Sequence, residues 1–143
     1  MCAPQFWVSG NARTSSPPLT LSAALATTAF AQTISIQAPV DGTTVQAGSS
    51  IAVEVLQHNS SSDLVQVALA IGLSIPNLTP AIGDTILYNG PFNPQVGTVQ
   101  NFIVTIPADT PTGPMSLNVA HFDLIGAIKI PHAETVNVTL NVV

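Results

Sequence analysis

An alternation of apolar and polar residues near the end of the chain most constrains what it can fold into. Every second position from 136 to 142 is apolar, and the positions between them are Asn or Thr. Successive side chains of a β-strand point to opposite faces, so a period of two predicts a strand with one buried and one solvent face. The buried face comprises Val136, Val138, Leu140 and Val142. The same parity places Asn137 in solvent.

This period recurs along the chain upstream. It marks six earlier segments, which are residues 33–38, 51–55, 65–71, 85–88, 100–106 and 115–124. Within 65–71 the larger apolar residues are expected to share one face, and they are Val65, Val67, Leu69 and Ile71. Alanines on the opposite face make both faces apolar, which predicts a central strand.

Turn-forming residues lie between the alternating segments. The chain has 12 Pro and 9 Gly, and they predict the loops. The expected loops are residues 39–42, 58–63, 74–84, 107–114 and 126–131. With no helical period, repeat or linker after residue 32, we predict one all-β domain. We expect a single antiparallel immunoglobulin-like β-sandwich of about seven strands.

The N-terminal segment predicts export. Residues 19–31 are apolar and uncharged, and they end in Ala29-Phe30-Ala31, a small-x-small pattern that signal peptidase accepts. We therefore expect a signal peptide over residues 1–31, cleavage between Ala31 and Gln32, and a mature domain over 32–143. An over-extended gene model is one explanation for the irregular residues 1–18, and a buried Ala-rich helix is the alternative to a signal peptide.

Charge excludes several classes of function. The chain has 2 Lys or Arg and 7 Asp or Glu, with a net charge of −5. Binding to nucleic acid needs a cluster of basic residues, so we expect none. We also expect no membrane span, because residues 19–31 are too short to cross a bilayer. The expected mature domain lacks cysteine, so it must be stable through core packing alone.

Three acceptor sequons predict a glycoprotein. They begin at Asn59, Asn77 and Asn137, and each has the form Asn-x-Ser/Thr. Attached glycans would keep an exported domain with few charges in solution. The expected location is therefore extracellular.

The sequence offers little catalytic chemistry. No Gly-x-Ser-x-Gly motif occurs, and the histidines are His58, His121 and His132. His121 and Asp123 share a strand face, and with His132 they could form a copper or zinc site. The interpretation we favour is a strand-end His and Asp that solvate a sheet face. We expect no enzyme activity, no catalytic residue, no metal and no cofactor.

Protein–protein recognition remains as the expected kind of activity. The aromatic residues of the mature domain are few for stacking on sugars, and they are Tyr88, Phe92, Phe102 and Phe122. In residues 119–127, Phe122, Leu124 and Ile125 cannot all enter one core. Some apolar surface is therefore expected to be exposed there as a contact site.

Four segments carry a resemblance to a known family. In order, they are residues 65–73, 106–113, 122–127 and 136–139. Together they resemble the fungal necrosis-inducing secreted protein (Nis1-like) effector family, over roughly 33–143. The resemblance implies a small effector of a plant-associated fungus, and it would place the protein in the host apoplast, with uptake into host cells. Such effectors suppress pattern-triggered immunity by binding host receptor-associated kinases, and some induce cell death. We expect a monomer.

The resemblance also implies contact residues within 107–127. They are Asp109, Pro111, Gly113, Phe122, Leu124 and Gly126. The first three are expected to shape a corner, and Phe122 and Leu124 to touch the partner. The family pattern has an aromatic residue where this chain has Ile125. Residues 36–50 are similar to fungal wall-associated sandwich domains, so the alternative is a wall domain that binds glucan or another polysaccharide.

Overall fold

The computed structural model describes residues 33–59, 62–77, 82–94 and 97–143, and all its regular structure is β-strand. The predicted cleavage site, Ala31 and Gln32, lies outside these residues. The strands are β1 (Ile34–Ala38), β2 (Thr43–Val45), β3 (Ser50–Gln57), β4 (Leu64–Ser74), β5 (Thr85–Gly90), β6 (Val99–Thr105), β7 (Gly113–Ile125) and β8 (Ile130–Val142). Within the described ranges no helix is long and apolar enough to cross a membrane.

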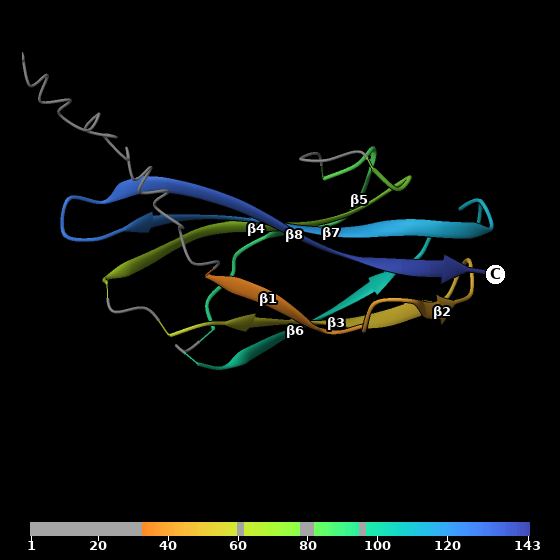
Figure 1. Cartoon of the computed structure of the whole chain (residues 1–143), viewed down its shortest axis with the longest axis horizontal. Coiled ribbons are helices and arrows are strands. Elements are labelled where there is room, and N and C mark those ends of the chain that lie inside the picture. Colours follow the sequence, from red (N-terminus) through yellow and green to blue (C-terminus); the bar gives the residue numbers. More distant parts are fainter. Residues whose placement is uncertain (1–32, 60–61, 78–81, 95–96) are drawn as a thin grey trace, which may run out of the picture.

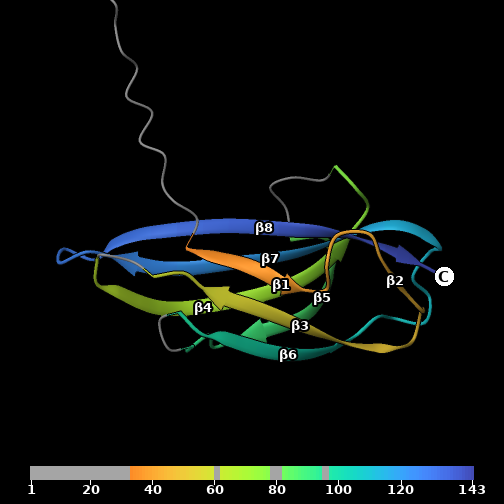
Figure 2. The ribbon, with the colours of Figure 1, turned by 60° about the horizontal axis from the view of Figure 1, so that its bottom comes forward.

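The strands form two sheets that face each other. One sheet has the order β1-β3-β6, and the other has the order β2-β8-β7-β4-β5. In Figure 1, β4, β5, β7 and β8 of the larger sheet lie above β1, β3 and β6, and in the turned view of Figure 2 the strands β1, β3 and β6 come to the front. The chain changes sheet after β1, where residues 39–42 connect it to β2. This arrangement is a β-sandwich.

The core lies between the sheets and follows the alternation of the strands. β3 contributes Val53 and Val55, and β6 contributes Phe102 and Val104. From the opposite sheet the fully buried aliphatic side chains are Leu69, Ile71, Leu73, Leu117, Val119 and Leu140. Burying a side chain of this kind stabilises the fold by roughly 1.5–3 kcal/mol before the cost of ordering it is subtracted.

The structure confirms the all-β sandwich and differs from the sequence prediction in the details of its strands. An eighth strand, β2, was not predicted, because only Val45 of its three residues is buried. β2 pairs in parallel with residues 140–142 of β8, so the second sheet is not wholly antiparallel. Pro131 lies inside β8 and not in a loop. It is tolerated there because no described strand pairs with that part of β8 on the side away from β7.

A β-bulge in β4 overturns the predicted common face of that strand. The pairing of β4 with β7 shifts register between Gln66 and Ala68, which makes Val67 the extra residue. Beyond the bulge Leu69 points into the core, whereas Val67 is exposed. The central position predicted for this strand is confirmed, since β4 lies between β7 and β5.

Candidate functional site

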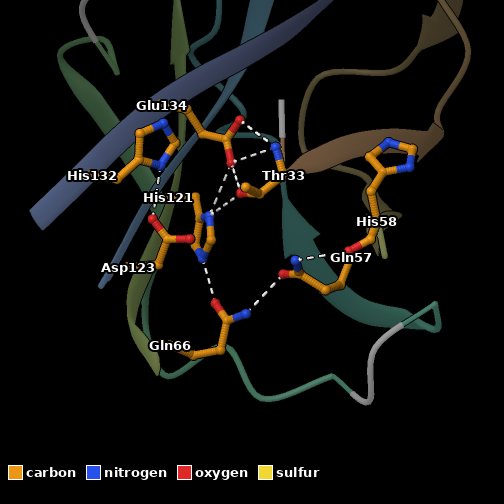
Figure 3. A network of polar contacts seen from close by, with 8 residues as sticks. All are labelled: Thr33, Gln57, His58, Gln66, His121, Asp123, His132 and Glu134. Atoms are coloured by element: carbon orange, nitrogen blue, oxygen red, sulfur yellow. Dashed lines mark hydrogen bonds and ion pairs between the residues drawn. The ribbon is translucent and has the colours of Figure 1, made fainter. Parts of the chain in front are cut away.

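The inward face of β7 and β8 changes from apolar to polar along the length of the strands. Leu117 and Val119 of β7 are apolar, and the next inward residues are His121 and Asp123, both almost fully buried. On β8 the same parity brings Glu134 and His132 beside them, because His121 pairs with Glu134 and Asp123 with His132. The chain therefore places ionisable groups inside one end of the sandwich. These polar residues form two neighbouring hydrogen-bonded groups, and we call them together the buried network (Figure 3): Thr33, Gln57, Gln66, His121 and Glu134 in one group, and Asp123 and His132 in the other.

Glu134 is the acceptor at the centre of the buried network. Thr33, which precedes β1, donates its backbone N–H to both carboxylate oxygens at 3.1 and 3.0 Å, and its hydroxyl also donates to Glu134. His121 Nδ1 lies 3.2 Å from Oε1. Burial raises the pKa of the Glu134 carboxyl, but the hydrogen bonds from His121 and Thr33 outweigh it, so the net pKa lies below its ordinary value.

The other ring nitrogen of His121 extends the buried network to the opposite sheet. His121 Nε2 lies 2.5 Å from Oε1 of Gln66. The Gln66 amide donates to Oε1 of Gln57 at 2.8 Å, and Gln57 is a fully buried residue of β3. The bulge in β4 turns Gln66 inward for this contact. Hydrogen bonds thus link β1, β3, β4, β7 and β8.

The hydrogen bonds among Thr33, Gln57, Gln66, His121 and Glu134 hold neighbouring strands together, and we call these five residues the clasp. Their geometry suits this structural role better than a catalytic relay. In a relay the nucleophile and the orienting carboxylate bind opposite nitrogens of the histidine. Here Thr33 Oγ1 and Glu134 Oε1 both approach Nδ1 of His121. His121 is 1% exposed, so a substrate would not reach it.

Asp123 and His132 form a separate pair beside the clasp. His132 Nδ1 lies 2.8 Å from Asp123 Oδ1, and Asp123 Oδ2 is buried without a hydrogen-bond partner among the described residues. Asp123 and His121 are interior residues, so the expectation that they solvate a sheet face was wrong. In the described part of the chain no three His, Cys, Asp or Glu side chains are arranged to hold a metal ion, and this includes the alternative set with His132.

The outer face of the same strands is apolar. Val65, Val67 and Phe122 are 41%, 45% and 39% exposed. Leu124 is half-buried and pairs with Val65, which places these side chains side by side across β4 and β7. We call Val65, Val67, Phe122 and Leu124 the Phe122 patch. Folding does not require large apolar groups on a solvent face, so their grouping points to a contact surface.

Small side chains leave a hollow beside Phe122. Its volume is about 210 Å³, and its lining includes Ala68, Ala70, Ala120 and Ala133. Ala68 and Ala133 flank Phe122 directly in the register of β4, β7 and β8. The ring of Phe122 projects beside this hollow. The ring can therefore insert into a partner, and the hollow can receive a side chain from that partner. This is the form that protein–protein hot spots commonly take.

The residues implied by the family resemblance do not form one site. Phe122 and Leu124 lie at one end of β7, with Gly126 in the turn that follows. Gly113 begins β7 at its other end, and Asp109 and Pro111 lie exposed on the corner before it. Phe122 follows Gly113 by nine residues along this strand, so about 30 Å separates the groups. Gly113 and Gly126 have φ angles of +117° and +78°, which favour glycine at both bends.

The aromatic side chains are mostly internal. Phe92 is buried in the core cluster and lies against Phe102 and His121, with ring centroids 6.3 and 5.2 Å apart. Tyr88 packs on Phe102 at 4.6 Å, and its hydroxyl donates to the carbonyl of Pro91. Phe122 is thus the one large aromatic group exposed in the described ranges. A platform of several rings for stacking sugars is not formed there.

The three asparagines of the predicted sequons lie on the surface. Asn59, Asn77 and Asn137 are all exposed, as an attached glycan requires. Asn137 projects from the outer face of β8, as its parity predicted. Asn77 and Asn137 line one shallow pocket together with Ser116 and Thr139. Two of the predicted glycans would therefore cover the same part of the five-stranded sheet.

Comparison with known families adds independent information. The model of the Nis1 family matches residues 29–141 of the chain. None of the curated proteins compared with the chain matches it. The matched range includes the whole buried network and the Phe122 patch.

Proposed function

Because the chain belongs to the Nis1 family, we propose that it is a secreted fungal effector that suppresses plant pattern-triggered immunity. In this proposal it acts as a monomer that binds host receptor-associated kinases and catalyses no reaction. The Phe122 patch is the surface that contacts the kinase. One observation carries this assignment of the surface: Phe122, Val65 and Val67 are exposed together on the outer face of the five-stranded sheet.

The buried network supports the proposal by fixing the strands that present this surface. Each strand of the Phe122 patch also contributes to the buried network, Gln66 from β4 and His121 from β7. Hydrogen bonds on the inner face hold these strands in one register. The outer side chains are then ordered before binding, which lowers the entropic cost of forming a complex.

Binding to kinase cytoplasmic domains tests the proposal. The full secreted protein would be compared with Phe122→Thr and Val67→Thr variants in pull-downs against receptor-associated kinases. Thr retains a high strand propensity and removes the apolar contact. We expect about tenfold or greater loss of binding for Phe122→Thr, which is the usual size of a hot-spot effect. Expressed in leaves, the same variant should no longer reduce the oxidative burst.

A matched control separates contact from folding. Ile103 of β6 is 73% exposed on the other sheet, so Ile103→Thr removes a similar apolar group elsewhere. This variant should bind kinases as the unmodified protein does. Unchanged kinase binding by Phe122→Thr would refute the assigned surface. Failure of the unmodified protein to bind any receptor-associated kinase, with no change in the burst, would refute the function.

Export and glycosylation are part of the same proposal. Cleavage between Ala31 and Gln32 would leave every strand intact, because β1 begins at Ile34. The exposure of Asn59, Asn77 and Asn137 suits glycan attachment. N-terminal sequencing of protein from culture medium should begin at Gln32, or be blocked by its cyclisation. The intact mass should fall on treatment with peptide N-glycosidase. Protein retained in the cell with residues 1–31 would contradict export.

A further inference from the structure

A cavity lies at the end of the sandwich away from the Phe122 patch. Its volume is about 490 Å³. It opens between the end of β4, the start of β5 and the corner that precedes β7. The walls include apolar groups from Leu73, Ile75 and Met115. We call this the corner cavity.

Two carboxylates line the corner cavity on different segments. Asp84 precedes β5, and Asp109 lies on the corner; both are exposed. Neither forms an ion pair with any described residue. Lys129 is the one basic residue in the described ranges, and it lies in the turn between β7 and β8, at the opposite end of those strands. No Lys or Arg of the described ranges therefore compensates the negative charge of this cavity.

The lining combines the two features that a long basic side chain needs. Lysine and arginine have an aliphatic stem that packs on apolar groups and a charged head that binds carboxylates. Ile75 and Pro111, both exposed, supply apolar surface, while Asp84 and Asp109 supply charge of the complementary sign. The hydroxyls of Thr85 and Thr110 add neutral acceptors to the same walls.

We propose that the corner cavity binds a lysine or arginine side chain of a partner protein. The stem would pack along Ile75, Pro107 and Pro111, with the charged head between the carboxylates of Asp84 and Asp109. This contact is separate from the Phe122 patch, so it stands whether or not that surface binds a kinase. It also gives Asp109 and Pro111, which line the cavity, a role beyond shaping the corner.

Titration of the full secreted protein with small probes tests this proposal by NMR. The probes are N-acetyl-arginine and N-acetyl-lysine methylamides, with the neutral citrulline analogue as the control. We expect saturable shifts of the backbone amides of Thr85, Thr110 and Met115 with at least one basic probe and none with citrulline. Raising the ionic strength from about 0.02 to 0.5 M should weaken the binding, because the carboxylates are exposed.

Variants locate the site. Asp84→Asn and Asp109→Asn should each weaken binding roughly two- to fivefold, and the double variant more, as expected for exposed charge pairs. Asp63→Asn is the matched control, since Asp63 is exposed and precedes β4 at its far end. It should bind as the unmodified protein does. Equal shifts with citrulline, or full binding by the double variant, would overturn the proposal. Each variant's own spectrum reports whether it is folded.

Discussion

The two ends of the β7–β8 hairpin have opposite arrangements of polar and apolar residues. At the corner end the inner residues are apolar, such as Leu117 and Leu140, and the outer face carries Asn137 and Asn141. At the turn end the inner residues are His121 and the acids of the buried network, while the outer face carries the Phe122 patch. One pair of strands therefore contains both a conventional half and an inverted half.

The inverted half is the more informative of the two. Burying apolar groups stabilises a sandwich, and exposing them does not. A polar interior must also be hydrogen-bonded throughout, or it costs stability. The turn end of these strands has both a polar interior and an apolar outer surface, although folding alone requires neither. In the proposed function the inverted half is the part that contacts the partner, and the conventional half contributes most of the buried apolar surface of these two strands.

The largest expected effect is in the conventional half. Leu117 is fully buried between the sheets. Leu117→Ala should lower the free energy of unfolding by about 2–5 kcal/mol, because it leaves a cavity that the surrounding side chains cannot fill. Ile103→Ala, an exposed apolar truncation, should change it by about 0.5 kcal/mol or less. Urea denaturation measures both. Equal losses would show that stability does not come mainly from this half.

A pH titration of stability tests the inverted half. The pKa of Glu134 is lowered in the folded state, so its carboxylate contributes stability above the ordinary pKa, near 4.5, and this contribution is lost as pH falls through the folded pKa. Glu134→Gln should cost about 1–3 kcal/mol at neutral pH, because hydrogen bonds to a charged acceptor are lost. It should also flatten the decline of stability below about pH 4.5.

Glu54→Gln is the control for this titration. Glu54 lies on β3 at a position of outward parity, opposite to the buried Val53, Val55 and Gln57. This variant should decline in acid as the unmodified protein does, and denaturant midpoints from pH 7 to 3 give the comparison. If the denaturant midpoints of Glu134→Gln and of the unmodified protein fell in parallel with pH, the Glu134 carboxylate would contribute nothing to the loss of stability in acid.

The sequence was sufficient for the conventional half and for the class of fold. Alternation in 136–142 predicted the inward face of β8 and the exposure of Asn137, because parity persists along a regular strand. The same parity, followed back from Val136, indicates that Glu134 and His132 also face inward. On β7 it extends from Leu117 to His121 and Asp123. This signal was present, but polarity suggested solvent for His121 and Asp123.

The remaining features depend on contacts that local patterns do not contain. The bulge at Val67 reverses the faces of β4, and no glycine or proline marks it in the sequence. β2 has three residues and gains its pairing from the distant end of β8. The corner cavity joins Asp84 and Asp109, which are separated by 25 positions and meet only when the sheets stack. Such features follow from tertiary packing.

The Phe122 patch should contribute little to stability, although its effect on binding is the largest. Phe122 is 39% exposed, so Phe122→Thr should lower the free energy of unfolding by only about 1 kcal/mol, against several for Leu117→Ala. Its kinase binding should nevertheless fall about tenfold or more. Binding and urea denaturation on one preparation of each variant separate the two quantities. A loss of binding that merely followed stability across both variants would remove the distinction between the halves, because Leu117 has no exposed surface with which to touch a partner.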